Sequence, residues 1–344
     1  MPSPIALAIP FFFLLMGVEW LVARRRGLSL YRFSDALVDL SCGMTQQIIL
    51  VFWAGALVAG YQWLYQFRLL NFDPASAVPW AIAFFAIDFT YYWWHRFSHE
   101  VNFMWAVHVV HHQSEDYNLA VALRQAIFSV WTIWPFHLAL AVFGLPPLVV
   151  FVVESLSTLY QFWIHTELIG DLGLFERVFN TPAQHRVHHA VNPQYLDKNY
   201  GATLCVWDRL FGTYEPQVEQ PVYGLVHPQR SFNPLWAQVS HFVTTAQRAR
   251  GLKGWDRLRV WFKPPGWGSP PPKAVTRAGQ HKFDVPLSSR EVAGLAVGLG
   301  VAVCGTTALL WLEDGMNLPA KAGMAAIPLL LIGGWGALLD RRAA

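Results

Sequence analysis

The sequence has few charged residues and few cysteines. Only 14% of its 344 residues are Asp, Glu, Lys or Arg, and the formal net charge is +3. The basic residues are scattered or lie beside apolar runs, which argues against a nucleic-acid partner. Three widely separated cysteines (Cys42, Cys205 and Cys304) give neither a disulfide framework nor a CxxC metal site. Apolar residues make up 54% of the chain, and this high share together with the low share of charged residues predicts an integral membrane protein.

Seven apolar runs are predicted to form membrane-embedded helices. They cover residues 5–22, 48–65, 77–94, 126–143, 148–164, 292–312 and 324–339. Arg24, Arg25 and Arg26 follow the first run, which marks it as an anchor rather than a cleaved signal and places its end on the cytoplasmic side. The membrane would be the inner membrane in a bacterium or the endoplasmic reticulum in a eukaryote.

The predicted fold is all-α: a multi-span helical bundle with an inner-side helical cap that holds a histidine-rich dimetal site. Four segments follow from composition: N-terminal spans (1–76), a catalytic core of spans and cap (77–235), a polar segment with a proline-rich linker (236–290) and a C-terminal pair of spans (291–344). The proline-rich linker runs from Pro264 to Pro272. The C-terminal pair contains no histidine, so we assign it to anchoring or to oligomer contacts.

Eight of the thirteen histidines lie in three short clusters. On a helix, residues three and four apart share one face, so each cluster directs its rings to a common point. Neutral imidazole suits Fe, Zn, Cu and Ni, and eight rings exceed the four ligands of a tetrahedral zinc site. The pattern therefore predicts two metal ions, bound by His95, His99, His108, His111, His112, His185, His188 and His189.

Polar residues inside the apolar runs are further candidates, because such residues are costly in a bilayer. Asp88, seven residues before His95, could accept the second N–H of a ligating imidazole. One helical face of the run 148–164 carries polar residues and leads to His165, which is a ninth candidate ligand. Glu154 and Gln161 on this face would support a ligand or hold water. From its position in the sequence alone, Glu100 is predicted to have a structural role, because it lies off the helical face that carries the ligands.

The three clusters, in the order HxxxH, HxxHH and HxxHH among apolar runs, resemble those of the fatty acid hydroxylase and sterol desaturase superfamily of membrane di-iron enzymes. Within it, residues 99–125, 160–167, 179–215 and 222–228 are similar to the alkylglycerol monooxygenase family. The resemblance implies two iron ions held by the eight clustered histidines, with O2 and an electron donor, for which tetrahydrobiopterin is the candidate. It also implies oxidation of the ether-bearing carbon of a membrane lipid, giving a fatty aldehyde and a glycerol derivative.

The same resemblance implies that Glu100, the acid after the first motif, is needed for activity. An alkyl tail would enter from the bilayer, with Phe84, Phe85, Trp131 and Trp134 as candidate pocket residues.

Other functions remain open at this point. A fatty acyl or sterol hydroxylase or desaturase would use the same metal site. A haem protein or a metal carrier is disfavoured, because a carrier needs polar residues throughout the bilayer depth rather than at one face. A zinc hydrolase is disfavoured because such sites usually keep three protein ligands and an open position.

Overall fold

The computed structural model describes residues 3–271 and 276–343, so Pro272 of the predicted linker lies outside the described residues. Within these ranges the regular structure is helical, with two isolated β-bridges and no strand. The predicted all-α fold class is confirmed. The apolar runs correspond to seven helices: α1 (Pro4–Arg25), α2 (Phe33–Tyr65), α3 (Ala77–Glu100), α5 (Ser129–Phe143), α6 (Pro147–Trp163), α11 (Ser289–Leu312) and α12 (Leu318–Ala343).

Four helical segments in the described part of the chain are long and apolar enough to cross a membrane. They are α1, α2, the segment Ser289–Gly315 that contains α11, and α12. The helices α5 and α6 are apolar but shorter. The predicted third span forms helix α3 but is not among the four, because Asp88 and the aromatic residues 91–94 lower its hydropathy.

Helix α2 begins fifteen residues before the predicted span 48–65. Its first half contains Asp35 and Asp39, which interrupt the apolar pattern in the sequence. Both carboxylates are buried, and Asp39 forms an ion pair with Arg124 at 3.0 Å. A tertiary partner thus extends the helix where the apolar pattern stops.

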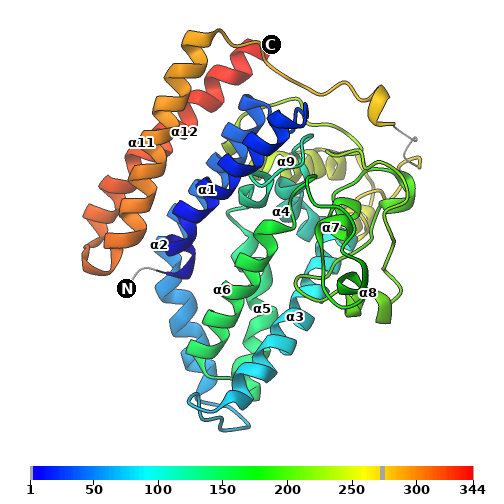
Figure 1. Ribbon diagram of the computed structural model, residues 1–344. Helices are drawn as coiled ribbons and strands as arrows, with labels where there is room; N and C mark the ends of the chain where they lie inside the picture. Colours follow the sequence, from blue (N-terminus) through cyan, green and yellow to red (C-terminus); the bar gives the residue numbers. More distant parts are fainter. Residues whose placement is uncertain (1–2, 272–275, 344) are drawn as a thin grey trace.

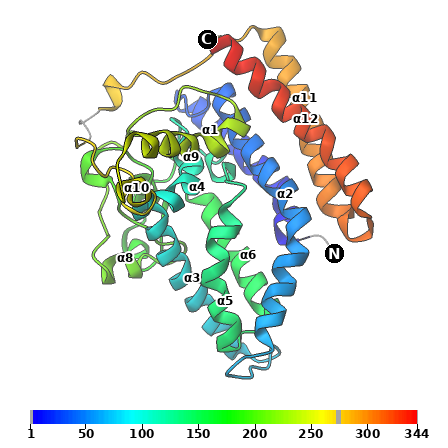
Figure 2. The same cartoon turned by 180° about the vertical axis from the view of Figure 1, so that it is seen from behind.

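The bundle has two sides. In Figures 1 and 2, α11 and α12 pack together beside α1 and α2, and α3, α5 and α6 lie on the other side of α2.

A tight turn joins α5 to α6, as predicted from its Gly and Pro residues. Gly144 has a φ of 115°, and a Cβ there would lie 2.1 Å from the Leu70 carbonyl oxygen, so glycine is required at this position.

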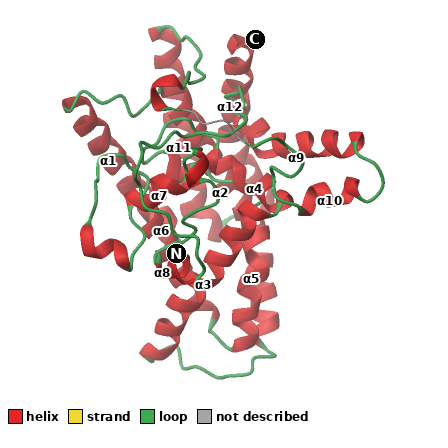
Figure 3. Cartoon of the chain, turned by 90° about the vertical axis from the view of Figure 1, so that its right-hand side faces the viewer, coloured by secondary structure: helices red, strands yellow, loops and turns green. Residues whose placement is uncertain are grey.

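The cap lies at the end of the bundle where α3 and α6 finish (Figure 1). Its helices are α4 (Asn102–His112), α7 (Pro182–His188), α8 (Val206–Leu210), α9 (Pro234–Gly251) and α10 (Asp256–Phe262). Figure 3 shows α9 and α10 extending sideways from the bundle. Pro182 occupies the first turn of α7, where its missing N–H leaves no hydrogen bond unmade. In this arrangement of the cap, α4 and α7 lie against the end of α3.

Candidate metal centre

The structure brings all nine predicted histidines together in the interior, each at most 7% exposed. Within each of two groups, the possible ligand atoms lie within 4.8 Å of one another. One group is His95, His99, His108, His112 and His188, and the other is His111, His165, His185 and His189. The sequence motifs do not map one to one onto the groups, because α4 and α7 each contribute to both.

Backbone carbonyls fix the orientation of four rings. Nδ1 of His95 lies 2.8 Å from the Tyr200 oxygen, and Nδ1 of His165 lies 2.7 Å from the Gln161 oxygen. The same contact joins His111 to Arg124 at 3.1 Å and His188 to Lys198 at 3.0 Å. A carbonyl only accepts hydrogen bonds, so Nδ1 must carry the proton. In the neutral ring the lone pair is then on Nε2, the atom available to a metal ion.

Several Nε2 atoms face one another at short distance. Nε2 of His111 lies 3.1 Å from Nε2 of His165, and both rings donate through Nδ1. Two neutral rings in this tautomer have no proton to share, so their lone pairs would repel unless a cation lies between them. Nε2 of His99 and of His188 is buried without any hydrogen-bond partner. The donor set therefore fits metal ions, in agreement with the predicted metal site.

Burial keeps these rings in the form that binds metal. The charged form of imidazole is penalised in the interior, and this lowers the pKa of His111 to about 4 and that of His188 to about 3. Both rings are therefore neutral at pH 7, and a metal ion does not have to displace a proton from them.

Asp88 does not contact an imidazole, contrary to the prediction. Its carboxylate accepts hydrogen bonds from the backbone N–H of Thr203 at 2.8 Å and of Leu204, and from the indole N–H of Trp207 at 2.8 Å. The seven-residue spacing that aligned Asp88 with His95 on one helical face also leaves it two turns away from that ring. The loop that it holds follows Tyr200, whose carbonyl orients His95. Asp88 thus contacts this loop and not a histidine ring.

Glu100 lies at the end of α3 and pairs with Arg96 at 2.8 Å, with 39% of its side chain exposed. Asp197, which follows the third histidine cluster in the sequence, lies closer to the centre, with Oδ1 3.8 Å from Nδ1 of His99. Asp197 has a φ of 59°, which is uncommon for a residue with a side chain. Its positive φ and the carbonyl contacts of Arg124, Lys198 and Tyr200 depend on the folded loops, so no sequence pattern marks them.

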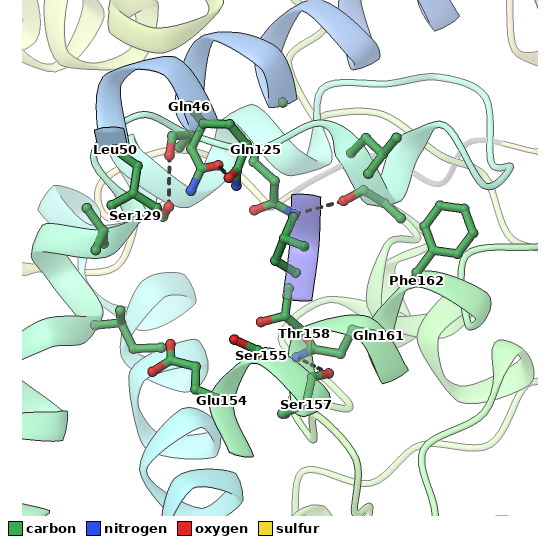
Figure 4. A pocket seen from close by; sticks show the side chains of 18 of the residues that line it. Gln46, Leu50, Gln125, Ser129, Glu154, Ser155, Ser157, Thr158, Gln161 and Phe162 are labelled. Atoms are coloured by element: carbon green, nitrogen blue, oxygen red, sulfur yellow. Dashed lines mark hydrogen bonds between the residues drawn. The ribbon is translucent and has the colours of Figure 1, made fainter. Parts of the chain in front are cut away.

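A cavity of about 470 Å³ reaches the centre from the membrane-embedded part. His108, His111 and His165 form its wall at one end, and α1, α2, α3, α5, α6, α11 and the segment 122–126 supply the rest. Figure 4 shows the polar face of α6, with Glu154, Ser157 and Gln161, opposite Gln46 and Gln125. Glu154 pairs with Nδ1 of His137 at 2.9 Å, and the Gln161 side chain bonds to the Ser157 carbonyl.

The prediction that four aromatic residues line the pocket is wrong. The cavity wall contains none of Phe84, Phe85, Trp131 and Trp134; Phe85 and Trp131 are exposed on the outside of the bundle. Aromatic residues on the outer surface of membrane helices cannot be distinguished from pocket residues by sequence. The C-terminal pair, which we assigned to anchoring or to oligomer contacts, also supplies part of the wall through Val303, Thr306, Thr307 and Leu310 of α11.

Comparison with known proteins agrees with this geometry. Residues 80–213, which contain all nine histidines, match the fatty acid hydroxylase family model. The metal centre therefore lies in a fatty acid hydroxylase domain.

Over a longer stretch the chain is similar to alkylglycerol monooxygenases. It is 42% identical to the Homo sapiens protein over 275 residues, which cover 79% of this chain and 62% of that protein. Identity to the Xenopus tropicalis protein is 41% over 274 residues, covering 79% of this chain and 61% of that protein. Identity to the Danio rerio protein is 41% over 238 residues, covering 69% of this chain and 53% of that protein. The chain therefore belongs to the alkylglycerol monooxygenase family, as the resemblance of its motifs indicated. It spans about three fifths of the length of the first two relatives. No solved structure matches the chain significantly.

Proposed function

We propose that the protein is an O2-dependent di-iron monooxygenase that oxidises the ether-bearing carbon of alkylglycerols. The observation that carries the proposal is one arrangement: two groups of buried, neutral imidazoles lie at the end of a cavity, and His108, His111 and His165 of these groups line it. The similarity to alkylglycerol monooxygenases supports the choice of an ether lipid.

Two groups of five and four imidazoles are suited to two ions rather than one. Imidazole nitrogen is a good ligand for iron and for zinc, but zinc has no redox chemistry. When bound, the irons would supply the oxidising power that attack on a C–H bond with O2 requires. The protein would supply the nine ligands, with the carbonyls of Arg124, Gln161, Lys198 and Tyr200 orienting four of them.

The other predicted site residues would act around this centre. Gln161 orients His165 through its carbonyl, and Asp88 holds the segment 203–207. Glu154 lies in the cavity wall with His137, and Glu100 pairs with Arg96 beside the first motif. The apolar remainder of the wall would exclude water and align the alkyl chain with the histidines.

We place the centre on the cytoplasmic side of the membrane. The basic residues Arg24–Arg26 at the end of α1 support this orientation. The chain that follows them lies beside the cap, because Asn118 donates to the Leu30 carbonyl at 2.7 Å. A cytoplasmic position would give a soluble electron donor, for which tetrahydrobiopterin is the candidate, access to the cap.

The experiment is an assay of purified protein with an alkylglycerol, O2 and reduced tetrahydrobiopterin. We expect release of a fatty aldehyde and two irons per chain. His188→Ala should abolish the activity, whereas His227→Ala, which changes an exposed histidine outside the two groups, should retain it. Hydroxylation of an acyl chain or a sterol, without aldehyde release, would contradict the ether substrate and favour the second candidate, a lipid hydroxylase of the same superfamily.

A further inference from the structure

The cavity wall formed by α6 is polar, although α6 is an apolar helix. Glu154, Ser157, Thr158 and Gln161 recur at steps of three and four and all line the cavity. Figure 4 shows their side chains directed into the cavity, opposite Gln125. Polar groups in a membrane-embedded helix are costly unless they meet protein, water or a polar ligand.

Three polar atoms of this wall are buried without a hydrogen-bond partner. They are Oγ of Ser157, Nε2 of His137 and Oγ1 of Thr306. Buried polar groups are almost always paired, so each unpaired atom requires an explanation. Nδ1 of His137 is already paired with Glu154, so Nε2 is the ring nitrogen without a partner. The three residues belong to α5, α6 and α11, and all three line the cavity.

The charge of the cavity wall limits which lipid head groups it can bind. The lining contains no Lys or Arg among the described residues, and Glu154 is its one carboxylate. A phosphate or carboxylate head group on this face would therefore lose its hydration without gaining the counter-charge of a basic side chain, and would also face Glu154. A head group with hydroxyls and no charge meets no such penalty.

We propose that the polar face of α6 binds the uncharged, hydroxyl-bearing head group of the substrate and that the absence of a Lys or Arg side chain from the wall excludes anionic lipids. This inference rests on the proposed function and names its head-group subsite. Gln161 and Ser157 lie four and eight residues before His165, which is about 6 and 12 Å along a helix. The glycerol hydroxyls lie four and five bonds from the oxidised carbon, roughly 5–7 Å at ordinary bond lengths. They therefore reach the first part of this face when that carbon lies at the histidines.

The rest of the wall suits the alkyl chain. Helix α1 contributes Ile5, Ile9, Phe12 and Phe13, and α2 contributes Leu50 and Leu57 among other apolar residues. One cavity thus has a polar face for the head group and an apolar face for the tail, both in reach of the histidines.

The first experiment measures lipid binding to the metal-free protein. It compares an alkylglycerol with an alkyl methyl ether that has the same tail and no hydroxyl. Gln161→Leu removes the side-chain amide within reach of the hydroxyls and keeps the backbone carbonyl that orients His165. It should weaken alkylglycerol binding about tenfold, which corresponds to one or two neutral hydrogen bonds. Binding of the methyl ether should not change. Gln194→Leu, which removes an exposed amide outside the cavity wall, is the matched control and should change neither.

The second experiment tests the charge filter with an alkylglycerol phosphate that has the same tail. The wild-type protein should bind it at least about a hundredfold more weakly than the alkylglycerol, as expected for a buried charge without a partner. Thr158→Lys, which places a cation in the cavity, should reduce this ratio at least about tenfold while methyl ether binding shows that the cavity is intact.

The outcomes separate the inference from the proposed function, because binding is measured without metal. Equal weakening of both ethers by Gln161→Leu, or no change in either, would overturn the subsite, and the second result would mean that this amide holds only water. Equal binding of the phosphate and the alkylglycerol to the wild-type protein, or failure of either ether to bind it, would also overturn it. A protein that binds as expected but releases no aldehyde would overturn the proposed function alone.

Discussion

Nε2 of His165 lies 3.0 Å from Nε2 of His185, which joins the end of α6 to α7 across twenty residues of chain. His165 lies outside the three histidine motifs, yet its contact with His185 is as short as those within them. The contact also means that the second group of histidines depends on α6, the helix that forms the polar wall of the cavity.

The first prediction concerns His165 as a metal ligand. His165→Ala removes one of the four imidazoles of its group, so we expect the iron content to fall from two toward one per chain. Elemental analysis of the purified protein measures this. The control is His281→Ala, which changes an exposed histidine outside both groups. Full iron content in His165→Ala would show that His165 only fills space beside the centre.

The second prediction concerns the indirect role of Asp88. Asp88→Ala leaves the N–H groups of Thr203, Leu204 and Trp207 without their acceptor, and unpaired buried donors cost about 1–3 kcal/mol each. We expect a lower unfolding temperature together with weaker metal retention, because the loop before these donors orients His95. Asp88→Asn keeps one acceptor oxygen and should lose less than Asp88→Ala. A variant with normal stability and reduced activity would instead support a direct catalytic role for Asp88.

Regular spacing explains what could be predicted from the sequence. Helical periodicity predicts that His95 and His99 share a face, and α3 shows this arrangement. It cannot predict that His111 joins His185 while its neighbour His112 joins His188, because that division depends on how α4 packs against α7.

Contacts through the backbone were not predictable in the same way. The oxygen that orients a ring belongs to Arg124 in one case and to Tyr200 in another, and any residue has such an oxygen. The first half of α2 could not be predicted as part of this helix for a related reason. Asp35 and Asp39 interrupt the apolar pattern of the sequence, and only the fold shows that both are buried beside Arg124. Sequence thus indicates which side chains do chemistry more readily than what holds them.

The third prediction concerns the pH dependence of stability in the metal-free protein. An imidazole has an ordinary pKa near 6.5, whereas burial lowers the pKa of His111 to about 4 and that of His188 to about 3. Between pH 6.5 and 4 the unfolded chain therefore binds protons that the folded protein does not. The free energy of unfolding should fall as pH is lowered through this window, by about 1.4 kcal/mol per pH unit for each such ring.

Thermal unfolding at pH 7.5 and pH 5.5 measures this effect. His111→Asn should unfold with a smaller dependence on pH than the wild-type protein, because one buried titratable ring is removed. Equal unfolding temperatures at the two pH values in the wild-type protein would contradict buried neutral imidazoles.

The fourth prediction concerns Arg124, which connects α2 to the metal centre. Its guanidinium pairs with Asp39 at 3.0 Å and bonds to the Val110 carbonyl, and its own carbonyl orients His111. Arg124→Ala leaves Asp39 buried without its counter-charge, and breaking such a pair costs about 3–5 kcal/mol. We expect a large loss of stability, measured by unfolding in detergent. Arg68→Ala, which removes an exposed arginine, should have little effect.

The double variant Arg124→Ala/Asp39→Asn separates the charge from the shape of the side chain. The amide that replaces the carboxylate is uncharged, so the penalty for a buried, unpaired carboxylate disappears and much of the stability should return. The backbone carbonyl at position 124 is present in every variant, so a variant that refolds should also regain its metal. If Asp39→Asn fails to restore stability, the contribution of Arg124 comes from its hydrogen bonds to Val110 and Gln113 rather than from its pairing with the carboxylate.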